Sequence, residues 1–261
     1  MRTVTREYLT VDGSRLEYCR IGPAAGDAPT IVFLHEGLGS ITQWKDFPAA
    51  LCARSGCRGL VYNRQGYGGS DTFDRLSQQF MHHEALDVLP RVLDALEITR
   101  PVLFGHSDGG SIALIYAGSG QPSPAALILE AAHVFVEDVT VRRIAELKAS
   151  YRSADLRARF ERHHGVNVDR LFDCWTQTWL SPEFRDWNIE EYLAGIDCAV
   201  LVLQGRDDEY GTLRQVTAIA AGVTHAETVV IDRCGHAPHI ERPDEVLDAT
   251  GEFLARRVCR T

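Results

Sequence analysis

The chain has 261 residues, of which 45% are hydrophobic and 24% charged, and its formal net charge is −9 at pH 7. This composition is ordinary for a globular protein, and the length suits one α/β domain with a large core. The acidic balance argues against nucleic acid or an anionic membrane as partner and leaves small molecules as the expected ones. We find no run of about 20 apolar residues that could span a bilayer and no apolar signal-peptide core in residues 1–8, so we expect a cytoplasmic protein.

Cysteine and histidine spacing predicts no metal or redox centre. The seven cysteines are odd in number and scattered, without a Cys-x-x-Cys pair. We expect them to be reduced and to serve mostly as small apolar residues. His82 and His83 are adjacent in a helix-like stretch, so they point to different sides and lack the i, i+4 spacing of a metal pair. Neither a metal nor an organic cofactor is expected.

Apolar runs in the first quarter of the chain predict a β-hairpin followed by buried strands. A turn signal, Asp12-Gly13-Ser14, separates the two short strand-like runs of the hairpin. The next two runs are continuous and apolar, which is typical of strands buried on both faces of a parallel sheet. Strands are expected at 8–11, 16–21, 30–34 and 59–62, with a helix at 43–54.

The remaining chain continues this alternation of strand and helix. Leucines at helical spacing predict a helix over 78–96, kinked at Pro90. Further strands are expected at 102–104, 125–132, 199–204 and 227–231, and further helices at 111–117, 212–221 and 243–257. The pattern predicts a mostly parallel, eight-stranded sheet with helices on both faces.

One stretch interrupts the alternation. Residues 134–196 contain no strand pattern and are rich in charged and aromatic residues, with helical spacing in 141–151 and 156–163. A connection of this length is too long for an ordinary loop. We interpret it as an inserted helical cap on a core made of residues 1–133 and 197–261.

A Gly-x-Ser-x-Gly turn joins the strand at 102–104 to the following helix. It reads Gly105-His106-Ser107-Asp108-Gly109. The central residue of such a turn adopts strained backbone angles, and flanking glycines are needed because a Cβ would clash with the incoming helix. Unpaired N–H groups at the helix start favour negative charge at the same place. Ser107 is therefore a candidate nucleophile beside an anion site.

A serine hydroxyl is a weak nucleophile unless a base removes its proton and an acid orients that base. The Ser107 turn resembles the nucleophile elbow of the α/β-hydrolases, and the resemblance extends over the chain except the predicted cap. In that family the acid lies three residues after a glycine that closes a strand. From Gly205 this position is Asp208, with Asp207 as the less favoured alternative.

The family resemblance also implies the base. The expected segment, Gly-His-x-Pro-x-x-Glu-x-Pro, is matched at every fixed position by residues 235–243, which makes His236 the base. The order Ser, Asp, His is that of the α/β-hydrolases, and all three residues follow predicted strands. His239 lies in the same segment, and its role is open.

The loop after the strand at 30–34 departs from the family pattern. Family members usually have His-Gly-x-x-Gly here, and the residue after His-Gly donates a backbone N–H to the oxyanion hole. Glu36 stands at the first glycine, so the donor is Gly37 by position or else Glu36, with the N–H of Asp108 as the second donor. The Glu36 carboxylate either faces a substrate or turns away and caps the next helix.

The resemblance implies acyl transfer by a serine hydrolase. We expect a carboxylesterase that cleaves a small ester, present as a monomer or homodimer. Carbon–carbon bond hydrolases and lactonases of catabolic pathways have the same serine, and a receptor-like binding protein with slow turnover keeps the same three residues. These alternatives stay open.

The predicted cap is expected to determine the substrate. Candidate contacts are Glu36, His106, Trp175 and Trp179. The tryptophans either line an apolar pocket or only attach the cap to the core. Eight basic residues stand against four acidic ones between positions 142 and 170, and they either bind a substrate carboxylate or lie in solvent.

Overall fold

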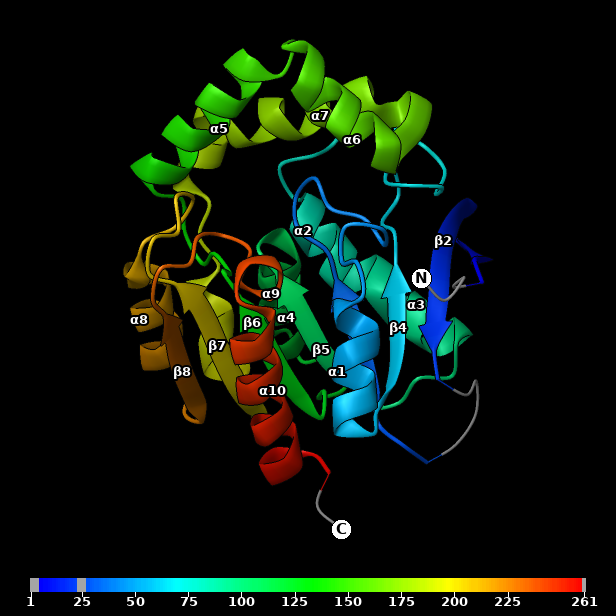
Figure 1. The fold of residues 1–261 in the computed structure, drawn as a ribbon, viewed down its shortest axis with the longest axis vertical. Helices are drawn as coiled ribbons and strands as arrows, with labels where there is room; N and C mark the ends of the chain where they lie inside the picture. The colour runs from blue at the N-terminus through cyan, green and yellow to red at the C-terminus, as the bar shows by residue number, and fades with distance from the viewer. Residues whose placement is uncertain (1–4, 23–26, 260–261) are drawn as a thin grey trace.

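The computed structural model describes residues 5–22 and 27–259 (Figure 1). Three parts of the predicted core lie outside the described residues. They are residues 1–4, 23–26 and 260–261. No described helix is long and apolar enough to cross a membrane.

The described residues form one eight-stranded sheet with the order β1-β2-β4-β3-β5-β6-β7-β8. Strands β1 and β2 form an antiparallel hairpin, β2 pairs antiparallel with β4, and all other neighbours are parallel. The strands are β1 (Glu7–Val11), β2 (Ser14–Ile21), β3 (Thr30–Leu34), β4 (Arg58–Tyr62), β5 (Val102–His106), β6 (Ala126–Glu130), β7 (Ala199–Gly205) and β8 (Ala226–Ile231). The mostly parallel sheet predicted from the apolar runs is confirmed.

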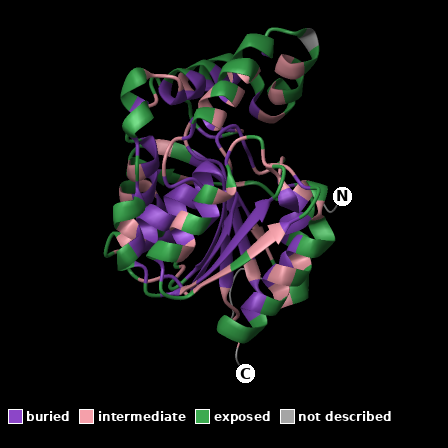
Figure 2. Cartoon of the chain, turned by 90° about the vertical axis from the view of Figure 1, so that its left-hand side faces the viewer, coloured by how far each residue is buried: buried purple, intermediate pink, exposed green. Residues whose placement is uncertain are grey.

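Helices cover both faces of the sheet because its central strands are apolar on both sides (Figure 2). Ile31 and Phe33 of β3 point to the face covered by α1 (Phe47–Ser55) and α10 (Pro243–Arg257). Val32 and Leu34 point to the opposite face. The remaining helices of the core are α2 (Phe80–His83), α3 (Leu89–Ala95), α4 (Asp108–Gly118), α8 (Leu213–Gly222) and the short α9 (Pro238–Glu241).

Two helices differ from the sequence expectation, and proline explains both. The helix expected from residue 43 begins at Phe47, because Pro48 is accommodated in a first helical turn and residues 41–46 form turns instead. The helix expected over 78–96 contains a π-helical turn, Glu84–Val88, which ends two residues before Pro90. Pro90 has no N–H to donate, and the wider turn accommodates this loss.

The segment between β6 and β7 is helical. It contains α5 (Asp138–Ser150), α6 (Ala154–His164) and α7 (Val168–Trp179), followed by the 3₁₀ turns Pro182–Asp186 and Glu190–Gly195. Figure 1 shows α5, α6 and α7 as a layer above the sheet, on the side where the parallel strands end. This layer lies over the edge at which open parallel sheets collect their ligands.

Candidate active site

Ser107 lies at the sharp turn between β5 and α4. Its backbone angles are φ +53° and ψ −119°, a conformation that a side-chain-bearing residue adopts only under constraint. A Cβ at Gly109 would lie 2.0 Å from the carbonyl oxygen of Leu34, and one at Gly105 would lie 2.3 Å from that of Gly109. The glycines therefore allow α4 to begin close against β3 and β5. Because of this close approach, the Ser107 side chain projects from the turn.

The structure brings Ser107, His236 and Asp208 into one hydrogen-bonded chain. The Nε2 atom of His236 lies 3.0 Å from Ser107 Oγ. The Nδ1–H of His236 donates to the Asp208 carboxylate, and Nδ1 lies 2.8 Å from Oδ1 and 3.0 Å from Oδ2. Asp208 also accepts the backbone N–H groups of Tyr210 and Gly211. Asp208 and not Asp207 is the carboxylate bonded to His236, and the backbone N–H of Asp207 donates to the carbonyl of Cys234.

Charges around His236 favour its protonated form. Burial lowers the pKa of His236, but the Asp208 carboxylate opposes this effect and the net pKa is raised, with Glu36 and Glu209 contributing in the same direction. Burial raises the pKa of Asp208, yet His236 and the Tyr210 N–H outweigh it, so the net pKa is lowered. Asp208 is thus a carboxylate that stabilises a positive imidazolium.

A short α-helix holds the loop that carries His236. Pro238 starts α9, and the Glu241 carboxylate at its end accepts the backbone N–H of Gly235 at 2.8 Å and that of Ala237 at 3.4 Å. The proline and glutamate of the 235–243 motif therefore shape the loop around the histidine.

The loop after β3 fixes one peptide group beside the site. The carbonyl oxygen of Glu36 accepts three hydrogen bonds, from Gly39 N at 3.1 Å, His35 Nδ1 at 2.8 Å and an Arg64 guanidinium nitrogen at 3.0 Å. In a trans peptide the N–H of Gly37 points opposite to this carbonyl. The N–H groups of Gly37 and Asp108 have no hydrogen-bond partner in the described part of the chain.

The Glu36 side chain bonds its own loop. One carboxylate oxygen accepts the Leu38 N–H at 2.7 Å, so Glu36 does not cap α1. The carboxylate also lines the cavity beside Ser107. Burial raises the pKa of Glu36.

Known proteins share this architecture along the whole chain. The model of the alpha/beta hydrolase family matches residues 31–249, a range that includes Ser107, Asp208 and His236. The chain belongs to the alpha/beta hydrolase family.

Relatives of this alpha/beta hydrolase have different substrates. It is 30% identical to the proline iminopeptidase of Lactobacillus delbrueckii subsp. lactis over 96% of this chain and 98% of that protein. It is 22% identical to the 2-hydroxy-6-oxononadienedioate/2-hydroxy-6-oxononatrienedioate hydrolase of Comamonas testosteroni, over 97% of each chain. The crystal structure of the enol-lactonase from Burkholderia xenovorans LB400 superposes with a TM-score of 0.72, at 22% identity, over 95% of this chain and 99% of that one.

In this alpha/beta hydrolase, His106 supports the His236 loop. Its Nε2–H donates to the backbone carbonyl of His236 at 2.8 Å. Burial lowers the pKa of His106 to about 3, so the ring is neutral. His106 also lines the cavity, but its Nε2–H already donates to the backbone carbonyl of His236.

A buried pair of hydrogen-bonded side chains, which no sequence motif predicted, lies next to His106. Glu130, at the end of β6, accepts the Nδ1–H of His239 at 2.7 Å and also the backbone N–H of His239. Burial raises the pKa of Glu130, but His239 outweighs it and the net pKa is lowered. Among the described residues, His106, Glu130 and His239 are the group whose potential metal-ligand atoms lie within 4.8 Å of one another. Glu130 already accepts both His239 donors, and we describe the group as a hydrogen-bonded pair that anchors α9.

A cavity of about 340 Å³ opens at Ser107 beneath the helical layer. Trp175 and Trp179 of α7 both line it, and Trp175 Nε1 donates to the Asp108 carboxylate at 2.9 Å. Phe184 and Trp187 are absent from the lining and stack on each other with ring centroids 5.5 Å apart. The tryptophan pair thus faces the site, whereas Phe184 also stacks on Phe80 of α2 and so joins the helical segment to the core.

Acidic side chains outnumber basic ones around this cavity. Its lining includes one basic residue of α6, Arg159, and four carboxylic residues, namely Glu36, Asp108, Glu209 and Glu241. Other basic residues of the layer form surface ion pairs, including Arg157 with Asp169 and Arg170 with Asp74. The basic side chains therefore lie mostly on the solvated face.

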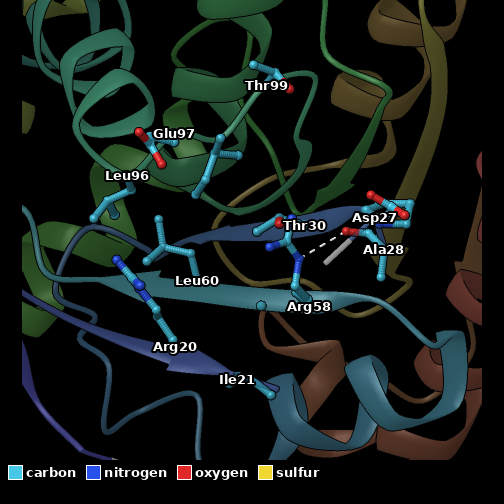
Figure 3. Close-up of a pocket in the computed structure, with 13 residues that line it drawn as sticks. Arg20, Ile21, Asp27, Ala28, Thr30, Arg58, Leu60, Leu96, Glu97 and Thr99 are labelled. Atoms are coloured by element: carbon cyan, nitrogen blue, oxygen red, sulfur yellow. Dashed lines mark hydrogen bonds between the residues drawn. The ribbon is translucent and has the colours of Figure 1, made fainter. Parts of the chain in front are cut away.

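A second hollow, of about 490 Å³, lies at the opposite ends of the strands (Figure 3). Arg20, Asp27, Arg58 and Glu97 line it, and Arg58 Nε donates to the carbonyl of Ala28. It lies at the start of β3 and β4, whereas Ser107 follows the end of β5. The hollow therefore plays no part at the Ser107 site.

Proposed function

We propose that this alpha/beta hydrolase is a serine carboxylesterase that cleaves a small ester through an acyl-enzyme on Ser107. The observation that carries the proposal is the hydrogen-bonded chain from Ser107 through His236 to Asp208. A serine, a base within hydrogen-bond reach and an acid that orients the base are the elements of nucleophilic acyl transfer.

The first half of the reaction acylates the enzyme. His236 Nε2 takes the proton of Ser107 while Oγ bonds to the ester carbonyl carbon, and the electron pair of the carbonyl moves to its oxygen. The N–H groups of Gly37 and Asp108 bind this oxyanion, and each such donor typically contributes about 2.7–4 kcal/mol to the lowering of the barrier. Collapse expels the alcohol, which takes the proton from His236.

The second half releases the acid. Water gives a proton to His236 as its oxygen attacks the acyl carbon, and collapse returns the proton to Ser107 Oγ. Asp208 keeps the imidazole oriented throughout and stabilises its positive charge.

The charge of the cavity supports a neutral ester over a dicarboxylate. The carbon–carbon hydrolase relative is named for a dioate substrate. Here the cavity is lined by Glu36, Asp108, Glu209 and Glu241 against Arg159. Placing a substrate carboxylate among these groups is electrostatically unfavourable.

Ester hydrolysis by purified enzyme tests the proposal. We expect 4-nitrophenyl butyrate to be turned over by the native enzyme and at least about 10⁴-fold more slowly by Ser107→Ala. Ser119→Ala, at the exposed end of the same helix, is the control and should keep native activity. Mono-4-nitrophenyl succinate, which adds a carboxylate, should give a lower kcat/KM than the butyrate. Activity that survives in Ser107→Ala would exclude the mechanism, and a preference for the succinate would favour the dicarboxylate class.

A further inference from the structure

His133 is a buried polar side chain that the mechanism does not use. It follows β6, is 2% exposed, and lines the cavity at Ser107. Its backbone carbonyl accepts the Ser111 hydroxyl at 2.6 Å, but neither ring nitrogen bonds to any residue that the structure describes. The Nδ1 atom is fully buried on the side of Gly211 and has no partner, so Nε2 is the ring nitrogen open to a ligand in the cavity.

A buried polar atom without a hydrogen bond is costly, and native proteins contain few of them. A phenylalanine or leucine at position 133 would avoid this cost. Burial lowers the pKa of His133 to about 4, and the nearby His236 adds to the effect. At neutral pH the ring is therefore uncharged and offers one N–H donor and one lone pair.

Packing fixes the His133 ring beside the reacting groups. Its centroid lies 5.9 Å from that of His236 and 5.7 Å from that of Trp179. Gly211 packs against another edge of the His133 ring. A Cβ at position 211 would lie 3.2 Å from His133 Cε1, so the glycine leaves room for the ring. The ring is thus held one side chain away from Ser107 and its base.

The charges around the ring restrict what it binds. Glu36, Asp108 and Glu209 line the same cavity, so a carboxylate is disfavoured as the group that meets His133. A hydroxyl group both donates and accepts, so it satisfies the imidazole in either tautomer.

We propose that His133 is a substrate-binding residue that hydrogen-bonds a hydroxyl group next to the scissile ester, so that the enzyme prefers hydroxylated esters to plain alkyl esters. The proposal rests on the proposed ester hydrolysis. It assigns the cavity a polar specificity element among its apolar and aromatic walls.

Matched pairs of esters test this preference. Methyl 3-hydroxybutyrate against methyl butyrate places the hydroxyl on the acyl side, and 2-hydroxyethyl butyrate against propyl butyrate places it on the alcohol side. The rate of hydrolysis is measured as the rate of acid release. We expect kcat/KM to be about tenfold higher for the hydroxylated member of at least one pair.

Variants identify the residue responsible. His133→Phe should abolish the preference by raising KM for the hydroxylated ester, while kcat for the plain ester changes by less than about threefold. His133→Gln, which retains a donor and an acceptor, should restore part of the preference. Thr217→Val is the control, because Thr217 lies on the exposed side of α8, does not line the cavity, and its hydroxyl bonds the carbonyl of Leu213. Its preference should equal that of the native enzyme.

Binding to Ser107→Ala, measured by calorimetry, provides a readout that requires no turnover. The same hydroxyl preference should appear in Kd and disappear in Ser107→Ala/His133→Phe. The proposal is overturned if the native enzyme shows no preference in either pair, or if His133→Phe retains it. Loss of ester turnover with the Kd preference intact would instead count against the proposed reaction alone.

Discussion

At the scale of single residues, His236 has to be neutral to accept the proton of Ser107, yet its surroundings favour the charged form. Asp208 is the main cause, and Glu36 adds to it. Because kcat/KM of such an enzyme requires the free base, it falls as the pH drops through the pKa of His236. We therefore expect the acidic limb of the pH profile to lie above the ordinary histidine pKa of about 6.5.

Glu36→Gln tests the contribution of the carboxylate. Glutamine keeps the acceptor that binds the Leu38 N–H but removes the negative charge, so the pKa of His236 falls and the acidic limb of kcat/KM moves to lower pH. Relative to its plateau, the variant is then more active at pH 6 than the native enzyme. Glu252→Gln, on the exposed side of α10, is the control and should leave the profile in place. An unchanged or higher limb in Glu36→Gln would contradict the assignment.

Residues within motifs were predictable, whereas residues that act through tertiary contacts were not. Ser107 and His236 lie in spacings that their chemistry requires, so the sequence identified the groups that converge here. His133 and Glu130 follow or end an apolar strand, and no local pattern distinguishes them from structural residues. The partner of Glu130, His239, is 109 residues away in the sequence, and the His133 Nδ1 atom has no partner among the described residues.

At the scale of elements, the approach of α4 to β3 and β5 determines where Ser107 is held. The elbow glycines were predicted from the need for space, and the carbonyl of Leu34 is the group that a Cβ at Gly109 would meet. The start of α1 and the π turn before Pro90 were not predicted, because helical spacing of leucines ignores the hydrogen bond that proline removes. Apolar periodicity thus locates elements better than it locates their ends.

Gly109→Ala tests this packing. The added methyl group meets backbone rather than a flexible side chain, so we expect a loss of about 1–3 kcal/mol in the free energy of unfolding. We also expect kcat to fall, because Ser107 shifts, and the rise in activation free energy should exceed the loss of stability. Urea unfolding and ester hydrolysis measure the two effects. Gly251→Ala is the control, because a Cβ there meets only the side chain of Arg54 and a helix interior favours alanine. If Gly109→Ala matched this control in both assays, the elbow would not require glycine.

At the scale of the whole molecule, the helical layer is attached at the loops that form the site. His164 at the end of α6 donates through Nε2 to the carbonyl of Leu38 at 2.9 Å, and its Nδ1 accepts the Gly68 N–H at 3.2 Å. Trp175 of α7 bonds Asp108 beside the nucleophile. The sequence predicted the helical insertion from its length, but these attachments depend on side chains that meet only in the folded chain.

The buried histidines make the stability depend on pH. Burial lowers the pKa of His35, His106, His133 and His164, so these rings stay neutral in the native state. In the unfolded chain they bind protons below about pH 6.5. Their contribution to stability is therefore complete above about pH 6.5 and is lost as the pH falls towards the native values, by up to about 1.4 kcal/mol per pH unit for each ring.

His164→Gln isolates one of these contributions. Urea unfolding between pH 7.5 and 5 should show a shallower loss of stability in this variant than in the native protein, by about one histidine's share. His225→Gln, at an exposed position, is the control and should keep the native slope. An equal slope in His164→Gln would mean that His164 is protonated in the native state.

The identity of the nucleophile is the claim on which the proposed reaction depends. A fluorophosphonate bonds covalently to a serine only where a base and an oxyanion site activate it. After treatment of the native enzyme and digestion, mass spectrometry should find one phosphonate on Ser107, with activity lost in proportion. Ser107→Ala should remain unlabelled. Labelling at another residue, or an unlabelled and fully active native enzyme, would contradict the account.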